Sequence, residues 1–277
     1  MFPSPKQAAG YLTEIKVSNT VKSLVSGNPF YCYQEKNYIS VRKIQVTFYS
    51  IWDVIHMSKE TPNPKNVVFD EIVFERRSHR RFWQEFPSKD DIKSIIDAGL
   101  HAPFAAAAVG NTKDYFRRFF ILKMDSKSMT TAASLIFEEV STMASKLELA
   151  MENNPKLREH ATEFTNRLAI IKKLGKVPGV GTAPYFIIVA EKKGFPAVEQ
   201  QSLAHCLENM WLKATALSLG FQLVSATAQM ADNPEFCAML EINPGEWAIN
   251  GCAIGYPAEE LSPSILPSVD EVTSWLE

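Results

Sequence analysis

The pattern of apolar and polar positions predicts helices and strands in an irregular order after residue 67. Residues 89–100 follow Ser88, a frequent helix cap, and carry apolar side chains on one face, so they predict a helix. Further helices are predicted over 128–150, 156–174 and 200–219, the last ending at Gly220 as its left-handed cap. Strands are predicted over 118–124, 183–190 and 247–254. Without a regular βαβ period, this order favours an α+β fold.

The first 66 residues differ from the rest of the chain. Residues 38–51 are rich in β-branched and aromatic side chains and predict a strand, whereas residues 60–65 are polar and contain two prolines. No motif that suggests chemistry occurs before residue 70. We therefore predict an N-terminal extension of unknown role over 1–66 and a main domain over 67–277.

Two of the predicted helices, 128–150 and 156–174, are separated by Asn-Asn-Pro at 153–155. Helices joined by so short a break are typical of a hairpin. The hairpin could pack on the core as a structural layer, or it could form a mobile cover over a pocket. The pattern alone leaves both possibilities open.

The composition excludes several classes of protein. Of the 277 residues, 46% are apolar and 22% are charged, which is typical of a soluble globular protein rather than a disordered or fibrous chain. No apolar run approaches the roughly 20 residues of a membrane span, and the first residues do not resemble a signal peptide. The four cysteines and five histidines follow no metal-binding spacing. We expect a cytoplasmic protein with reduced thiols, no metal site and no membrane partner.

The net charge of −2 is unevenly distributed along the chain. Residues 214–277 contain nine acidic and no basic residues, so the first 213 residues carry a net charge of +7. Any site for an anion is therefore expected mainly in the first part of the chain.

The densest group of basic residues lies at 76–82, which reads Arg-Arg-Ser-His-Arg-Arg-Phe. It could be a solvated face or a nucleic-acid patch, but a chain of near-neutral charge with one further arginine pair does not favour nucleic acid. A guanidinium binds phosphate through two parallel hydrogen bonds. Arg76, Arg77 and Ser78 could surround one phosphate, and Arg80 could reach another part of the ligand. The cluster thus predicts a phosphate-bearing cofactor.

Together with later motifs, this cluster resembles the nitroreductase family of FMN-dependent oxidoreductases. The family signature Arg-Arg-Ser-x-Arg-x-Phe is matched at 76–82. Other family motifs follow in the family's order: Ala-Pro at 102–103, Ala-Pro before an apolar strand at 183–184, Leu-Gly at 219–220, Gly-Tyr-Pro at 255–257 and Glu-Val-x-x-Trp at 271–275. The resemblance covers residues 68–277.

The resemblance implies a nitroreductase-like α/β sandwich, with a central, mainly antiparallel sheet flanked by helices. It also implies an intertwined homodimer with FMN at the interface. The cofactor-binding residues that it implies are Arg76, Arg77, Ser78, Arg80, Pro103, Phe104, Ser225, Ala226 and Thr227. No catalytic residue is implied, because the flavin itself takes a hydride from NAD(P)H and passes electrons to a nitroaromatic, a quinone or a similar electron-poor substrate.

The chain departs from the family pattern at two places within this resemblance. Alanines occupy 105–108, where the family commonly has Ser and then Asn, and Asn111 follows at a longer spacing. The segment 264–268 has no basic residue, although the family often has one there for the phosphate. Alternatives therefore include a specialised member (flavin fragmentation, dehalogenation or azoline dehydrogenation) and a non-catalytic flavin-binding or degenerate member.

Overall fold

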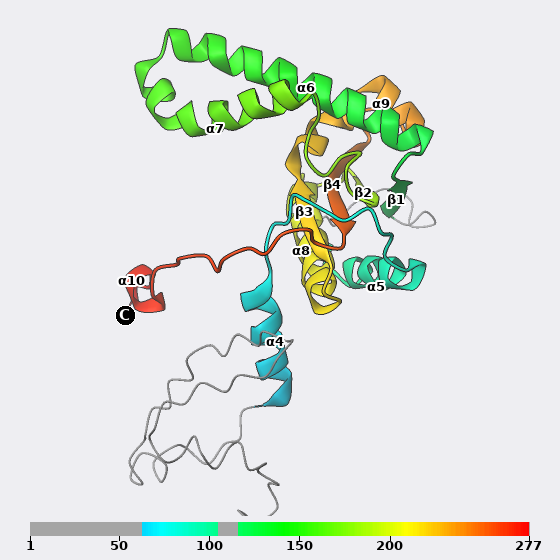
Figure 1. Ribbon diagram of the computed structural model, residues 1–277, viewed down its shortest axis with the longest axis vertical. Helices are drawn as coiled ribbons and strands as arrows, with labels where there is room; N and C mark the ends of the chain where they lie inside the picture. The colour runs from blue at the N-terminus through cyan, green and yellow to red at the C-terminus, as the bar shows by residue number, and fades with distance from the viewer. Residues whose placement is uncertain (1–62, 105–115, 277) are drawn as a thin grey trace, which may run out of the picture. The chain divides into compact units, whose positions relative to one another are not determined.

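The computed structural model describes residues 63–104 and 116–276, which belong to one compact unit, Thr61–Glu277 (Figure 1). Residues 1–62 of the predicted N-terminal extension, including its strand at 38–51, lie outside the described residues, as do residues 105–108 and Asn111. The boundary predicted between residues 66 and 67 falls inside the first described helix, α4.

The described helices include the four that were predicted and four others. They are α4 (Pro64–Glu75), α5 (Lys89–Leu100), α6 (Lys127–Glu152), α7 (Pro155–Leu174), α8 (Glu199–Ala216), the 3-10 helix η3 (Ser225–Asp232), α9 (Pro234–Met239) and α10 (Val269–Val272). The described strands are β1 (Arg117–Lys123), β2 (Tyr185–Lys192), β3 (Gly220–Val224) and β4 (Trp247–Gly255). Strand β3 was not predicted.

The four strands form one sheet in the order β1-β2-β4-β3, and every neighbouring pair is antiparallel. The central strand β2 pairs with both β1 and β4, so that Ile188 lies opposite Phe120 on one side and Gly251 on the other. Its residues 185–191 are all buried, as expected of a strand that is covered on both faces. The antiparallel sheet confirms the predicted fold class, whereas the homodimer stays a prediction.

Helices cover both faces of this sheet. Successive side chains of a strand point to opposite faces, so one strand contributes to an apolar cluster on each side. On one face, Phe186 and Ile188 of β2 pack in an apolar cluster with α6, η3 and α9. On the other face, Ile187 and Val189 pack in a second cluster with α5 and α8. Figure 1 shows α6 and α9 on one side of the strands, with α5 and α8 on the other.

The helix ends follow local sequence signals. The Ser88 side chain accepts a hydrogen bond from the Asp91 N–H at 3.0 Å, which confirms the predicted cap of α5. The Asn154 side chain caps α7 in the same way, and Gly175 ends α7 with a left-handed φ of 65°.

The predicted role of Gly220 as the cap of α8 is wrong. Helix α8 ends at Ala216, the left-handed residue is Ser218 with φ of 56°, and Gly220 begins β3. A Cβ atom on Gly220 would lie 3.1 Å from the Cβ atom of His79 and 3.2 Å from the Phe82 ring. Glycine is therefore needed at this position for the close approach of another segment, not for a helix end.

Candidate functional site

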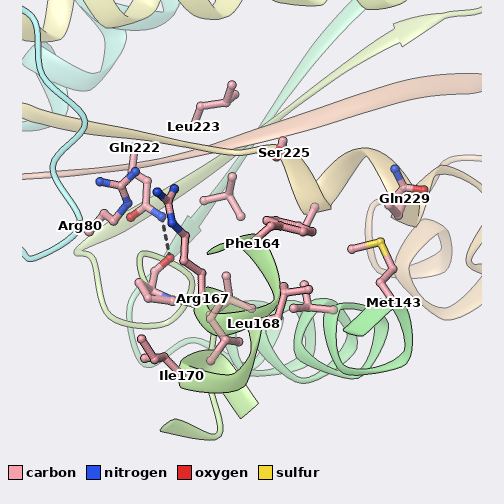
Figure 2. A pocket seen from close by; sticks show the side chains of 16 residues that line it. Arg80, Met143, Phe164, Arg167, Leu168, Ile170, Gln222, Leu223, Ser225 and Gln229 are labelled. Atoms are coloured by element: carbon pink, nitrogen blue, oxygen red, sulfur yellow. Dashed lines mark hydrogen bonds between the residues drawn. The ribbon is translucent and has the colours of Figure 1, made fainter. Parts of the chain in front are cut away.

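A cavity of about 880 Å³ lies between helices α6 and α7 on one side and β3 and η3 on the other (Figure 2). Its walls are mainly apolar, with two arginines and a few polar groups. The described residues that line it are Arg80, Val140, Met143, Phe164, Arg167, Leu168, Ile170, Ile171, Val177, Pro178, Gln222, Leu223, Val224, Ser225, Ala226 and Gln229. This combination of apolar walls and a few polar groups is typical of small-molecule and cofactor sites.

Arg80 reaches the cavity from an extended segment that lies along β3. Ser78 forms a bridge with Phe221 of β3, and the His79 N–H donates to the Phe221 carbonyl at 3.0 Å. The carboxylate of Glu259 holds the next residues: it accepts from the Arg80 backbone N–H at 3.0 Å and from Arg81 Nε at 2.7 Å. These hydrogen bonds, led by that of the Arg80 N–H, lower the pKa of Glu259. The carboxylate therefore stays ionised and fixes the base of the Arg80 side chain.

The first two arginines of the cluster make other contacts. Arg76 Nε lies 3.6 Å from Glu208 Oε1, and its guanidinium lies 4.5 Å from the centre of the Trp211 ring. Arg77 donates to the carbonyl oxygens of Phe74 at 2.6 Å, Arg76 at 2.8 Å and Ser262 at 3.2 Å. Neither arginine lines the cavity, and neither does Ser78. Their contact with a phosphate stays a prediction.

Pro103 and Phe104 also lie away from the cavity lining. The Phe104 ring stacks on the Phe116 ring with the ring centres 3.7 Å apart. Buried Arg117 donates from one terminal nitrogen to the carbonyl oxygens of Gly99 at 2.8 Å and Ala102 at 3.3 Å. The end of α5 is therefore tied to β1, and any contact of this turn with a ligand remains a prediction.

The residues after β3 lie partly at the cavity and partly in the core. Ser225 and Ala226 line the cavity, whereas the Thr227 side chain is fully buried. Its hydroxyl has no hydrogen-bond partner among the described residues. The hydroxyl packs close to Gly251, where an added Cβ atom would lie only 2.8 Å from it. Of the predicted cofactor-binding residues, the structure thus brings together Arg80, Ser225 and Ala226 at one cavity.

Several lining residues were not predicted from the sequence. Phe164, Arg167, Leu168 and Ile171 come from one face of α7, at the three- and four-residue spacing of a helix. The sequence signal for these lining residues was the predicted helical hairpin, for which a cover over a pocket was one of the two possible roles. Helix α6 buries five residues in the core and α7 buries only Leu168, so α6 acts as a packing layer and α7 as a wall.

Gln222 is the most buried polar side chain of the lining, with 8% of its surface exposed. Its Nε2 donates to the Pro178 carbonyl at 3.0 Å, and its Oε1 has no partner among the described residues. A Cβ atom on Gly179, whose φ is 89°, would lie 2.7 Å from that oxygen, so Gly179 leaves it room. The signal for Gln222 was missed because β3 was interpreted as a loop.

The described residues offer little for other kinds of site. Over 63–104 and 116–276, no group of three or more His, Cys, Asp or Glu side chains could hold a metal ion. None of the helices in the described part of the chain is long and apolar enough to cross a membrane.

Comparisons with known proteins agree with this fold. No curated protein sequence matches the chain. A crystal structure of a nitroreductase with bound FMN from Bacteroides fragilis has 21% identity and a TM-score of 0.52, covering 76% of this chain and 98% of its own. A protein from Desulfovibrio desulfuricans, in complex with FMN, has 20% identity and a TM-score of 0.51, covering 78% and 99%. An iodotyrosine deiodinase bound to FMN and 3-iodo-L-tyrosine has 19% identity and a TM-score of 0.51, covering 73% and 96%.

The family model that matches the chain is that of the nitroreductase family, and the match extends over residues 73–256. This span is more than half of the chain and includes every strand of the sheet. The chain therefore belongs to the nitroreductase family.

Proposed function

We propose that this protein is an FMN-dependent oxidoreductase that takes reducing equivalents from NAD(P)H and passes them to an electron-poor acceptor such as a nitroaromatic or a quinone. One observation carries the proposal: Arg80, Ser225 and Ala226, which were predicted as flavin contacts, line the same cavity. Membership of the nitroreductase family also supports it.

The residues of the cavity fit FMN in size and chemistry. A volume of about 880 Å³ is within the usual range for a cofactor site. Val224, Ala226 and Leu168 offer apolar surface to a flat ring system, and Arg80 offers a permanent positive charge to an oxygen-rich edge. The unpaired Gln222 Oε1 offers an acceptor to a ring N–H.

When bound, FMN supplies the hydride and electron chemistry. The protein's own residues bind, orient and shield the reactants. Glu259 fixes the backbone of Arg80, so that its charge stays at one end of the cavity. The apolar side chains of α7, among them Phe164 and Leu168, limit the access of water to the ring-binding space. No side chain of the protein needs to act as a nucleophile.

We propose a homodimer in the cytoplasm as part of the same function. Large apolar side chains are exposed in α4 and in the C-terminal segment: Val67, Val68, Phe69, Val73, Phe74, Leu261, Ile265, Leu266, Val269, Val272, Trp275 and Leu276. So many exposed apolar residues mark an interaction surface, and we assign it to a second copy of this chain. Light scattering should give twice the mass of one chain. A monomer at micromolar concentration would contradict the dimer.

The experiment that tests the flavin proposal starts with the absorbance spectrum of the purified protein. We expect bound FMN at about one per chain, and oxidation of NAD(P)H that depends on a nitroaromatic or quinone acceptor. A colourless protein that neither binds added FMN nor oxidises NAD(P)H would refute the proposal. Product analysis with a halogenated substrate, or without NAD(P)H, tests the specialised alternatives.

A matched pair of variants tests the site itself. Arg80→Met should weaken FMN binding by roughly ten- to a hundredfold, the effect of one lost charge-assisted hydrogen bond of about 1.5–3 kcal/mol. Arg118→Met removes the same charge at an exposed position of β1 outside the cavity lining and should change FMN affinity little. Equal losses in the two variants would place the flavin elsewhere.

A further inference from the structure

The cavity has a strongly positive end. Arg80 and Arg167 both line it, from the segment along β3 and from α7. In Figure 2 both guanidinium groups point toward the part of the cavity where the Gln222 amide lies. None of the described lining residues is acidic, so these two arginines leave a formal charge of +2 without a carboxylate in the lining. Two converging cations repel each other unless an anion lies between them.

Both guanidinium groups are available to such an anion. Arg167 lies 3.8 Å from Glu163, but the two side chains are 72% and 90% exposed. A solvent-exposed pair of this kind is weak and readily exchanged for a ligand. Near Arg80, the Glu259 carboxylate is bonded to the backbone N–H and to Arg81 rather than to the Arg80 guanidinium.

Gln222 places a buried amide group at the positive end. The side chain is more than nine-tenths buried, its Nε2 is held by the Pro178 carbonyl, and its Oε1 has no partner among the described residues. Neither guanidinium is hydrogen-bonded to this oxygen, which is therefore left to accept from a ligand.

The rest of the cavity suits a flat apolar body. Phe164 and Leu168 line it from α7, and Val224 and Ala226 line it from β3 and η3. The predicted flavin contacts Ser225 and Ala226 belong to the β3–η3 side. A second ligand that lies against the flavin must therefore contact α7, the opposite wall.

We propose that the α7 wall binds the electron acceptor and that Arg167 selects acceptors that carry a carboxylate on an aromatic ring. This inference rests on the proposed flavin function. The aromatic ring would pack beside Phe164 and Leu168, and the carboxylate would accept hydrogen bonds from Arg167 at the positive end.

The test compares two acceptors of similar size, the anionic 4-nitrobenzoate and the neutral 4-nitrobenzamide. The FMN-loaded wild-type protein should reduce the benzoate with a kcat/KM at least about tenfold higher than the benzamide. Arg167→Met should lower kcat/KM for the benzoate by roughly ten- to a hundredfold, mainly through KM, and leave the benzamide almost unchanged.

Lys173→Met is the matched control. It removes the same charge from α7, at an exposed position outside the cavity lining, and should leave both acceptors unaffected. An unchanged ratio of benzoate to benzamide in Arg167→Met, or an equal effect of Lys173→Met, would overturn the proposal.

Two binding measurements separate this inference from the flavin proposal. FMN and riboflavin titrations of the flavin-free protein show whether Arg167 instead holds the FMN phosphate. If Arg167→Met weakens FMN much more than riboflavin, the acceptor assignment is wrong. If the purified protein binds no flavin, the proposed function fails, but calorimetry with benzoate and benzamide still tests the anion-binding end. A preference for benzoate that Arg167→Met abolishes supports the proposed anion-binding end, and equal binding of benzoate and benzamide overturns it.

Discussion

The Nε atom of Arg117 lies 2.6 Å from Oε1 of Glu191, and both side chains are completely buried. The two residues are register partners in β1 and β2. Arg117 also donates to the carbonyl oxygens of Gly99 and Ala102 at the end of α5. One buried ion pair therefore joins the sheet to the turn that contains the Ala-Pro motif.

Removal of one partner of this pair should destabilise the protein strongly. Arg117→Met leaves the Glu191 carboxylate buried without its counter-ion, a change that typically costs about 3–5 kcal/mol. Burial already raises the pKa of Glu191, and Arg117 opposes that effect, so the carboxylate becomes harder to ionise in the variant. Urea denaturation at pH 7 measures the free energy of unfolding.

The double variant Arg117→Met/Glu191→Leu is the control for this prediction. It removes both charges and should recover a large part of the lost stability, because no unpaired charge is left. A loss below about 1 kcal/mol in the single variant would mean that water reaches the pair.

His79 should make the protein less stable in mild acid. Its Nδ1 is buried without a partner, and burial lowers its pKa below 6.5, with Glu259 opposing and Arg77 adding to the effect. The unfolded chain therefore binds a proton at a higher pH than the folded chain does. The contribution of His79 is complete above pH 6.5 and declines as the pH falls from 6.5 toward the lower folded pKa.

The variant His79→Gln should therefore lose less stability than the wild type between pH 7.5 and pH 5, as measured by urea denaturation at both values. His205→Gln, at an exposed position of α8, is the matched control and should follow the wild type. An equal loss in the free energy of unfolding for the wild type and His79→Gln would contradict the prediction.

The described cysteines should be unreactive in the folded protein. Burial raises the pKa of Cys206 to about 12, raises that of Cys252 well above its usual value, and also raises that of Cys237. The thiolate is the reactive form, so these thiols are both protonated and inaccessible at pH 8. A colorimetric thiol assay should detect at most Cys32, which lies outside the described residues, before unfolding. Rapid labelling of two or more thiols would refute this.

Thr227→Val tests whether Thr227, one of the predicted cofactor-binding residues, contacts FMN through its hydroxyl. The buried Thr227 hydroxyl has no partner among the described residues and does not line the cavity. Replacing an unpaired buried polar group with an apolar one of the same shape should raise the free energy of unfolding by about 1 kcal/mol. FMN affinity, measured by titration, should stay within about twofold.

Ser225→Val is the comparison for this variant. It places a larger apolar side chain at the cavity lining and should weaken FMN. If Thr227→Val weakened FMN as much as Ser225→Val, the hydroxyl would be a ligand contact.

Much of the fold could be predicted because its signals are local. The cap at Ser88, the break at Asn154 and Pro155, and the continuous apolar run of β2 each depend on neighbouring residues alone. Strand β3 was missed because five residues between a helix and η3 are too few to show a period.

The sequence alone determined the four long helices, three of the four described strands, the basic cluster and the order of motifs that pointed to the nitroreductase family. Only the tertiary structure decided which residues of that cluster meet at a cavity. Arg76 and Arg77 find partners in Glu208 and Ser262, while Arg80 joins Arg167 of α7. The physical reason is that hydrogen-bonding caps and hydrophobic periods act between near neighbours, whereas the direction of a long charged side chain is set by partners that only folding brings close.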